Sequence, residues 1–352
     1  MKSMIKKYLL LLLAVFIYNS CERDVEPLEV QKLFEYDEQY YANLRAYKES
    51  DHTVFFGWYA AYGGRVQDPA SWGERILGLP DSVDIISFWA GIPGNDPGDP
   101  DSYRPVAYAD WQFVREKKGT RFVATTITRI RGKSFKLKDG REYDIPTTIT
   151  DAELTDDMIE AWSQYLIEQA LDKGVDGIDL DYEPEGTEPL TGTRFLTMVS
   201  YIGAQFGPLS EHPERLFTIN YYGNIPPVEC GQYVNYYIKQ AYTQGFSEHS
   251  ASRLQTYYNA VSSAIPPEKF IVTEQMSVWY ANGGSPFVEA DGNRFTTDGS
   301  QMYSMEGMAR WNPTQGRKGG FGGFYFDRDY YHAKGPYYNV RRAIQIANPA
   351  VR

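Results

Sequence analysis

The segment KGVDGIDLDYEPEG, residues 173–186, is the most informative part of this chain, because it sets a dense row of acidic residues inside a strand-like run. Asp176, Asp179, Asp181 and Glu183 fall within eight residues. In a β-strand, residues two apart point to the same face, so the last three share one face at spacings of roughly 6–7 Å. Burying three carboxylates in a row costs several kcal/mol each unless they are paired, hydrogen-bonded or protonated. The row therefore predicts a raised pKa in at least one member, as a general acid requires.

A solvated turn and a calcium loop are the alternatives for this acidic row. A turn is disfavoured because Val175, Ile178, Leu180 and Tyr182 supply the apolar residues of a buried strand, which Pro184 ends. A calcium loop needs oxygen ligands in a D-x-[DN]-x-[DN]-G pattern, which the segment lacks. The sequence therefore favours a catalytic row of carboxylates on a strand.

Composition limits the class of protein. The chain has 352 residues, 42% of them hydrophobic and 15% aromatic, a length that suits one large α/β barrel or two ordinary domains. Its formal net charge of −11, without a basic stripe, argues against nucleic acid as the partner. Most of the 29 Tyr and 7 Trp are expected in the core, and a subset can stack on the apolar face of a sugar ring.

The N-terminus carries a targeting pattern. Residues 1–20 have early lysines, then an apolar run too short to span a membrane, then small and polar residues before Cys21. Cys21 stands where a bacterial lipoprotein is lipidated, and the acidic stretch after it resembles the export signal of surface lipoproteins. We therefore expect lipid anchoring to the outer membrane, at the cell surface or in the periplasm; a cleaved, soluble secreted protein is the alternative. With Cys21 lipidated, Cys230 has no partner for an intrachain disulfide.

Apolar runs of strand length alternate with amphipathic runs of helix length. The predicted strands cover 53–59, 83–89, 121–127, 177–183, 216–222, 236–242, 269–275 and 322–327. The clearest helix spans 156–173, and others are expected near 40–47, 73–77, 109–117, 192–206, 250–263, 302–311 and 340–346. This alternation predicts an α/β fold, a (β/α)8 TIM barrel, as a single catalytic domain over 49–352. A tether and a short helix over 21–48 are expected to precede it.

The active site of such a barrel lies at the C-terminal ends of its strands, where Glu183 ends the fourth strand. Polar residues two apart occur at three other strand ends: Asn220 with Tyr222, Gln240 with Tyr242, and Thr273 with Gln275. Filling of the barrel interior is the alternative for these pairs. Glu274 has the other parity, so we expect it to pair with a helix.

Aromatic residues also fall near strand ends, namely Trp58, Trp89, Trp279 and Phe326. They can form a platform for sugar rings, and core packing is the alternative for each. The four histidines show no metal-ligand spacing and no Ser or Cys partner, so neither a metal site nor a catalytic triad is expected.

The acidic row resembles a known family signature. Asp176-x-x-Asp179-x-Asp181-x-Glu183 at the end of a fourth barrel strand is similar to the D-x-x-D-x-D-x-E signature of glycoside hydrolase family 18. That family includes chitinases and the endo-β-N-acetylglucosaminidases that cut N-glycans. All four acidic positions match, and the strand and helix order from about residue 50 onward fits the family's barrel.

Within the family, the chain resembles the endo-β-N-acetylglucosaminidases more than the chitinases. Chitinases usually carry Trp where Tyr182 stands, and Met-x-Tyr-Asp where residues 240–243 read QAYT. The Gln-x-Tyr pattern resembles the endo-β-N-acetylglucosaminidase version of that strand. Chitinases also have Ser-x-Gly-Gly where residues 124–127 read ATTI, and a Trp where Phe326 or Tyr325 stands.

The resemblance implies substrate-assisted catalysis with retention, in which the sugar's own 2-acetamido group is the nucleophile. Glu183 is implied as general acid and then base, and Asp181 as the group that holds the acetamido N–H. Asp179 is implied to orient Asp181, and Tyr242 with Gln240 to position the acetamido carbonyl. The parity of Asp176 indicates a structural role at the strand start instead.

The resulting prediction is an endo-acting hydrolase of the GlcNAc-β1,4-GlcNAc core of N-glycans, monomeric and without cofactor. A chitinase-like enzyme with the same mechanism is one alternative. A surface glycan-binding protein on the same barrel is another, although such proteins usually lose the acid that Glu183 supplies here. The loops at 91–105 and 129–144 are the expected walls of the specificity pocket.

Overall fold

The computed structural model describes residues 36–63, 71–243 and 247–349. The chain divides into a short unit that ends at Tyr40 and a large unit that begins at Tyr41 and contains the whole barrel. Within the large unit, Arg45 donates to the carbonyl of Lys117, and Lys48 donates to the carbonyl of Val83. These bonds explain why the large unit begins inside the segment that the sequence assigned to the tether and short helix.

The N-terminal predictions are only partly covered by the structure. Helix α2 (Glu38–Glu49) includes the predicted helix at 40–47 and extends it at both ends. The signal at 1–20 and Cys21 lie outside the described residues. In the described part of the chain, no helix is both long and apolar enough to cross a membrane.

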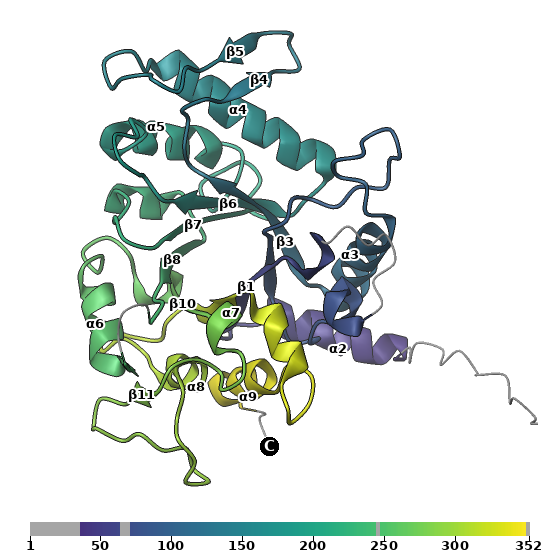
Figure 1. Cartoon of the computed structure of the whole chain (residues 1–352), viewed down its shortest axis with the longest axis vertical. Helices are drawn as coiled ribbons and strands as arrows, with labels where there is room; N and C mark the ends of the chain where they lie inside the picture. Colours follow the sequence, from purple (N-terminus) through teal and green to yellow (C-terminus); the bar gives the residue numbers. More distant parts are fainter. Residues whose placement is uncertain (1–35, 64–70, 244–246, 350–352) are drawn as a thin grey trace, which may run out of the picture. The chain divides into compact units, whose positions relative to one another are not determined.

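Eight parallel strands form a closed barrel, as the sequence predicts (Figure 1). Around the barrel the order is β1-β12-β10-β8-β7-β6-β3-β2. The strands are β1 (Val54–Tyr59), β2 (Ile85–Phe88), β3 (Arg121–Ile127), β6 (Gly177–Tyr182), β7 (Leu216–Tyr221), β8 (Tyr236–Gln240), β10 (Phe270–Gln275) and β12 (Gly320–Phe324). Each lies within one or two residues of its predicted range at both ends, except that β12 ends three residues early.

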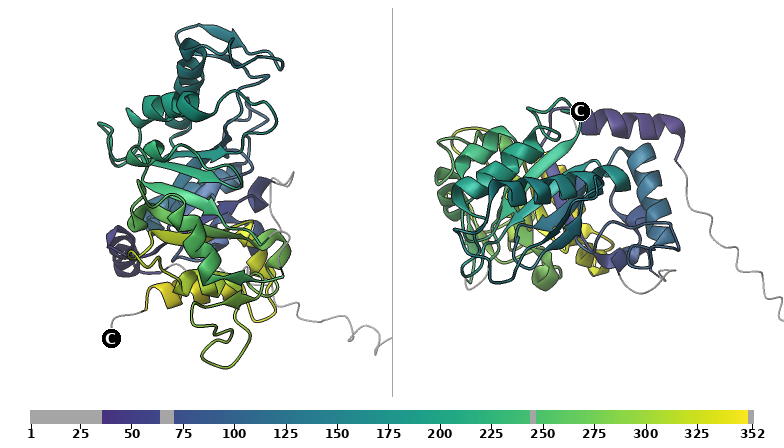
Figure 2. Two further views of the ribbon diagram at one scale, coloured as in Figure 1. Left: turned by 90° about the vertical axis from the view of Figure 1, so that its left-hand side faces the viewer. Right: turned by 90° about the horizontal axis from the view of Figure 1, so that it is seen from above.

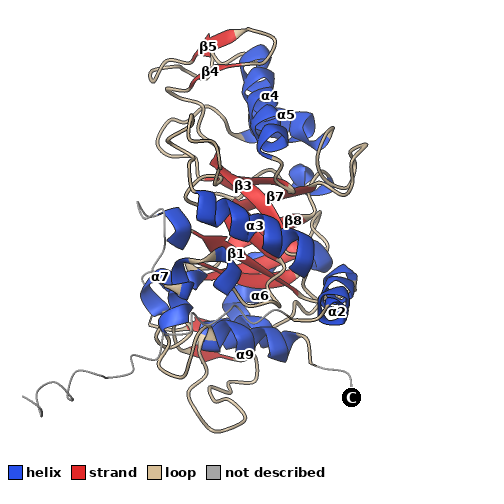
Figure 3. Cartoon of the chain, turned by 90° about the vertical axis from the view of Figure 1, so that its right-hand side faces the viewer, coloured by secondary structure: helices blue, strands red, loops and turns tan. Residues whose placement is uncertain are grey.

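Helices surround the barrel, and α-helices separate its successive strands except at β1–β2 and β7–β8, where the described connections contain 3-10 turns (Figure 3). These α-helices are α3 (Pro105–Lys118), α4 (Asp156–Lys173), α5 (Gly192–Gly203), α6 (Ala251–Asn259), α7 (Met276–Trp279), α8 (Ser304–Arg310) and α9 (Tyr338–Ala347). The helix expected at 73–77 is wrong. Two 3-10 turns occupy this region instead, because Arg75 takes an extended conformation (φ −101°, ψ 130°) between them.

Local sequence signals in α4 and β6 position the acidic row in the barrel. The Thr155 side chain caps α4 by accepting a hydrogen bond from the Met158 amide, and the helix ends at Gly174 in the left-handed region (φ 71°). Beyond this cap β6 begins at Gly177. The short connection fixes the strand's parity and therefore which side chains face inward.

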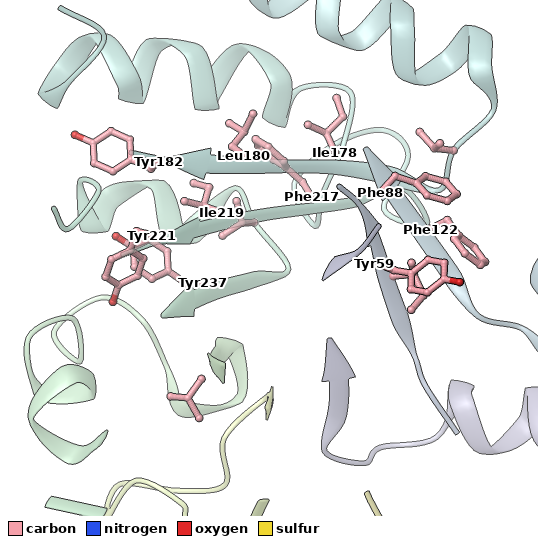
Figure 4. Packing of buried hydrophobic residues seen from close by; sticks show 14 of the residues in the cluster. Tyr59, Phe88, Phe122, Ile178, Leu180, Tyr182, Phe217, Ile219, Tyr221 and Tyr237 are labelled. Atoms are coloured by element: carbon pink, nitrogen blue, oxygen red, sulfur yellow. The ribbon is translucent and has the colours of Figure 1, made fainter. Parts of the chain in front are cut away.

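Two separate apolar clusters lie on the two faces of the barrel sheet. Figure 4 shows the outer one, where Ile178 and Leu180 of β6 lie beside Phe217 and Ile219 of β7 on the side that faces the helices. Tyr182, next along β6, has its ring centroid 4.4 Å from that of Phe195 on α5. With the apolar residues of β6 turned outward, the acidic residues between them point into the barrel.

The inner cluster is small and includes Phe56, Trp58 and Ile238. Strand β12 contributes glycine at two of its inward positions. A Cβ added to Gly322 would lie 1.6 Å from the carbonyl oxygen of Phe56, so no side chain fits there. This close approach lets β12 pair with β1 and close the barrel.

Both of the loops expected to wall the pocket contact α4. Strands β4 (Ser134–Lys136) and β5 (Glu142–Asp144) form a hairpin that lies beside α4 (Figures 1 and 2). The Phe135 ring of this hairpin packs on Trp162 of α4. In the loop at 91–105, Asp99 accepts a hydrogen bond from Lys173 in the last turn of α4. Both loops follow the C-terminal ends of their strands, β2 and β3, which is the end of the barrel at which Glu183 follows β6.

Candidate active site

The acidic row lies on the inner face of β6, as parity predicts. Asp179 and Asp181 are fully buried, whereas Glu183 lies just past the strand end with its side chain one third exposed. Asp176 lies at the strand start, where it accepts from the Phe122 amide and pairs with Arg115 at 2.9 Å. The row therefore runs from a structural ion pair at one end of the barrel to an accessible carboxyl group at the other.

Asp179 is held by four side-chain donors. Its Oδ2 accepts from Trp58 Nε1 at 3.0 Å and from Ser87 Oγ at 2.8 Å, and its Oδ1 accepts from Thr218 Oγ1 at 2.6 Å and Asn220 Nδ2 at 3.1 Å. Burial raises the pKa of Asp179, and these four bonds oppose that rise because they favour the carboxylate form. Asp179 is thus a carboxyl group of fixed orientation at the centre of a polar network.

Asp181 has far fewer partners. Its Oδ1 accepts from Gln240 Nε2 at 3.0 Å, while its Oδ2 is buried without a hydrogen-bond partner in the described part of the chain. Burial raises the pKa of Asp181 to about 8, with further contributions from Glu183 and then Asp179. Asp181 therefore holds a proton at neutral pH, and its second oxygen is left for a ligand.

Gln240 joins Asp181 to the network around Asp179. The same Nε2 also donates to Asn220 Oδ1 at 2.6 Å, and Asn220 donates in turn to Asp179. The register places Asn220 beside Asp181, so both amides lie in one layer of the barrel. The structure therefore brings Gln240 and Asn220 into the candidate site.

Tyr242 lies two residues past the end of β8. Its ring centroid is 5.8 Å from that of Tyr222 and 6.1 Å from that of Phe324. Burial, followed by the charges of Asp181 and Glu183, raises the pKa of Tyr242 well above its usual value. The phenol is therefore neutral and can donate a hydrogen bond to a ligand near these carboxyl groups.

The aromatic wall of the site differs from the prediction at its last strand. Phe326 is fully buried among the outer residues Phe55 and Tyr59, because β12 ends at Phe324 and Tyr325 turns the chain in the left-handed region (φ 51°). Phe324 takes the place expected for Phe326. Its ring lies 5.0 Å from Trp89 and 6.3 Å from Trp58, as centroid distances.

The other aromatic candidates divide in the same way. Trp89 and Tyr222 are partly exposed. Trp58 is 1% exposed and uses its indole N–H on Asp179, so it supports the network and is not an open platform. Trp279 ends the short helix α7, four residues beyond Gln275, which closes β10. Among the described contacts, none joins Trp279 to Asp181 or Glu183.

Lys239 was not predicted, and it supports the exposed Tyr222. Its ammonium group lies over the rings of Tyr257, Tyr221 and Tyr222, at 4.8, 5.0 and 5.5 Å from their centroids, and donates to the backbone carbonyl of Tyr222. Burial lowers the pKa of Lys239 to about 8. Its neighbour Gln240 faces the barrel interior. Strand β8 therefore supports the site with Gln240 on its inner face and with Lys239 on its outer face.

Glu274 confirms the inference from its parity. It is buried on the outer face of β10 and accepts from Ser304 Oγ, the first residue of α8, at 2.6 Å and from Thr243 Oγ1 at 2.7 Å. Within the described ranges, no group of three His, Cys, Asp or Glu residues is placed to hold a metal ion. The groups near Asp181 and Glu183 that can act on a ligand are carboxyl groups, amides and the Tyr242 phenol.

A closed parallel barrel with a partly exposed acid beside a protonated, buried carboxyl group defines a barrel glycosidase. The family described as "Glycoside hydrolase family 18, BT1044-like" matches residues 21–346, and the chain belongs to glycoside hydrolase family 18. The protein is therefore a glycoside hydrolase.

Among similar proteins, Endo-beta-N-acetylglucosaminidase F2 of Elizabethkingia meningoseptica is 24% identical over 307 residues, which cover 82% of this chain and 77% of the relative. A solved structure of BT1044 matches with a TM-score of 0.70 at 20% identity, over 89% of this chain and 93% of that one. An endo-beta-N-acetylglucosaminidase from Cordyceps militaris matches with a TM-score of 0.63 at 18% identity, over 90% and 98%. The structural likenesses establish the shared fold.

Proposed function

We propose that this glycoside hydrolase is a retaining endo-β-N-acetylglucosaminidase that cleaves the GlcNAc-β1,4-GlcNAc core of N-glycans. The observation that carries the proposal is the free Oδ2 of Asp181, since a buried carboxyl oxygen without a partner suits an acetamido N–H. Tyr242 lies near these carboxyl groups and can donate a hydrogen bond to an acetamido carbonyl, while Gln240 uses both of its N–H hydrogens to hold Asp181 and Asn220 in place.

In the first step Glu183 donates its proton to the glycosidic oxygen. The acetamido carbonyl oxygen of the sugar attacks the anomeric carbon as the bond to the leaving group breaks, which gives an oxazolinium ion. Asp181 accepts the acetamido N–H. This hydrogen bond favours the carboxylate form of Asp181, so Asp181 gives up its proton to solvent as the substrate binds, and its negative charge then offsets the positive charge on the ring.

In the second step Glu183, now a carboxylate, takes a proton from water. The resulting hydroxide attacks the anomeric carbon from the side that the leaving group vacated, and the oxazolinium ring opens. Two inversions leave the configuration of the anomeric carbon unchanged. The carboxyl group of Asp179 lies behind Asp181 and, after burial and Glu183, adds to the rise in the pKa of Asp181.

The choice of N-glycan over chitin as the substrate rests on Gln240 and Tyr242 at the end of β8 and on the names of relatives. The proteins from E. meningoseptica and C. militaris are both called endo-β-N-acetylglucosaminidases. Strand β12 carries no Trp, and the ring that it places in the site is that of Phe324, near Trp58. Chitin cleavage and glycan binding without cleavage are the alternative functions that an experiment must separate.

The test is incubation of the full-length protein with a glycoprotein and, separately, with a chitin oligomer, followed by mass spectrometry of released sugars. We expect N-glycans that end in a single GlcNAc, and no release by the Glu183→Gln variant. Cleavage of the chitin oligomer alone would overturn the substrate assignment. Binding without any cleavage by the wild-type protein would overturn the enzymatic one.

We also propose that Cys21 is lipidated and anchors the enzyme to the outer membrane, where glycoproteins are within reach. The support is the sequence pattern alone, with early lysines, a short apolar run and the cysteine after it. Expression with a labelled fatty acid should label the wild-type protein and leave the Cys21→Ala variant unlabelled. Equal labelling of both proteins would exclude Cys21 as the lipidated residue.

A further inference from the structure

The loop after β3 is fixed to the end of β6 by three consecutive residues. Thr128 donates from its amide (2.9 Å) and its Oγ1 (3.1 Å) to the carbonyl of Asp181. Arg129 donates from Nε to the carbonyl of Glu183 at 3.0 Å, and the Ile130 amide donates to Glu188 at 3.2 Å. The guanidinium of Arg129 is therefore held beside the acid by contacts on both sides of it.

Arg129 faces two carboxyl groups at unequal distances. Its Nη2 lies 2.7 Å from Oε1 of Glu185 and 3.8 Å from Oε2 of Glu183. Glu185 is largely exposed, whereas the side chains of Arg129 and Glu183 are each one third exposed. The guanidinium thus makes a close ion pair with the outer carboxylate and stays within reach of the inner one.

The charges around Glu183 come from three elements. Asp181 and Asp179 lie on β6 behind it, and Tyr242 lies beyond β8 and is neutral. Arg129 faces it from the loop after β3, and its charge also acts to lower the pKa of Asp181. Among the described residues, Arg129 is the cation that faces these carboxyl groups.

We propose that Arg129 is a positioning residue that Glu185 holds beside Glu183, and that this pair sets the pH at which the site loses the proton that cleavage consumes. The inference rests on the proposed role of Glu183 as general acid. With Glu183 protonated, Arg129 is paired with Glu185. Once Glu183 has given up its proton, the same guanidinium is close enough to stabilise the new carboxylate by a small side-chain rotation.

The direction in which each substitution shifts the alkaline limb of kcat/KM follows from the charge that it removes. A nearby cation favours the carboxylate, so Arg129→Gln should let Glu183 keep its proton to higher pH. Glu185→Gln releases Arg129 toward Glu183 and should have the opposite effect. Because these groups are partly exposed, we expect shifts on the order of 0.5–1 pH unit in the alkaline limb of kcat/KM.

The experiment measures pH profiles of kcat/KM for wild type, Arg129→Gln, Glu185→Gln, the double variant and Arg129→Lys. We expect the alkaline limb to rise in the first single variant, to fall in the second and to return near wild type in the double variant. Arg129→Lys should keep the limb in place but lower kcat several-fold, because lysine cannot reproduce the bond to the carbonyl of Glu183. The matched control is Arg141→Gln, which removes an arginine paired with Asp139 on the remote hairpin.

A second readout does not depend on the substrate. Titration of the Glu183 carboxyl by carbon NMR, with glutamate labelled at Cδ and the signal assigned by Glu183→Gln, should show the same opposite shifts. Circular dichroism confirms that each variant is folded. Shifts in the same direction, or none, in the two charge variants would overturn the role of Arg129. Opposite NMR shifts in a protein that cleaves neither glycan would instead overturn the proposed function and leave only the effect of Arg129 and Glu185 on the Glu183 proton.

Discussion

Gln240 Nε2 donates a hydrogen bond of 3.0 Å to Asp181 Oδ1 and one of 2.6 Å to Asn220 Oδ1, so both hydrogens of one side-chain amide are used inside the barrel. The amide is therefore fixed in orientation, and so is the carboxyl group that it holds. The free oxygen of Asp181 has one direction in which to meet a ligand. Several of the expected outcomes depend on this geometry.

Replacing Gln240 by leucine should lower kcat about 10²-fold, comparable with the loss of one preorganised donor in other hydrolases. The substitution removes the donor to Asp181 and leaves Asn220 Oδ1 unpaired in the interior. The measurement is kcat on the cleaved substrate. Gln164→Leu, on the surface of α4, should leave kcat unchanged. A Gln240→Leu variant with more than half the wild-type kcat would contradict this assignment.

The proton on Asp181 should make stability depend on pH. In the unfolded chain an aspartate loses its proton near pH 4, whereas burial raises the pKa of Asp181 to about 8 in the folded protein. Between these values the folded state binds more protons than the unfolded state, so the contribution is full below pH 4 and is lost as pH rises to 8. The slope from this group is at most about 1.4 kcal/mol per pH unit.

Urea unfolding of wild type and Asp181→Asn at pH 5 and pH 8 isolates this group from other titrating residues. The variant keeps a neutral side chain of the same shape, so its stability relative to wild type should increase as pH rises. A difference between the two proteins that stays constant across this range would show that Asp181 is already ionised at neutral pH.

Replacing Trp58 by phenylalanine should lower kcat several-fold, because Asp179 loses one of its four donors. The matched control is Trp111→Phe. Trp111 is also fully buried, but its Nε1 has no hydrogen-bond partner in the described part of the chain, so only packing is lost. Kinetics and thermal unfolding of both variants separate the two effects. Equal kcat values would mean that the indole bond has no part in the reaction.

Substitution of Phe324 should affect the kinetics, whereas substitution of Phe326 should affect stability. Phe324→Ala is expected to raise KM and lower kcat, because Phe324 lies among the site aromatics Trp89 and Tyr242. Phe326→Ala should cost about 3–5 kcal/mol of unfolding free energy, as for a large residue removed from a core, with kcat retained in the folded fraction. Urea melts give the unfolding free energy, and steady-state kinetics give kcat and KM. A kinetic defect in Phe326→Ala and a stability defect in Phe324→Ala would show that Phe326, and not Phe324, lies in the site.

Lys239→Met should raise KM more than it lowers kcat. Methionine keeps much of the chain's volume but loses the bond to the carbonyl of Tyr222, so the exposed Tyr222 is held less firmly. Lys269→Met is the control, because Lys269 also bonds to two backbone carbonyls but lies at the start of β10, the other end of the barrel. An unchanged KM for Lys239→Met would separate this lysine from substrate binding.

The acidic row and the strand order followed from sequence because both depend on short-range rules. A two-residue period fixes the shared face of Asp179 and Asp181, and alternating strands and helices at this length form a closed barrel. The prediction for Phe326 was wrong because the end of β12 depends on Tyr325, a non-glycine residue at positive φ that no sequence rule indicates.

Other parts of the site could not be predicted because they depend on contacts between distant segments. Arg129 meets Glu183 across 54 residues of sequence, and Trp58 meets Asp179 across 121. The hairpin beyond Arg129 was expected to wall the pocket, but its Phe135 ring packs on Trp162 of α4. Long-range packing of this kind leaves no periodic signal in the sequence.

The glycines of β12 have a consequence for how this barrel can change over time. Since a Cβ at Gly322 would collide with the backbone of β1, this position should accept almost no substitution. A deep mutational scan should therefore show an intolerant position that is explained by barrel closure. The hairpin β4–β5, in contrast, should tolerate insertions, so a binding module added there should leave the geometry of Asp181 and Glu183 unchanged.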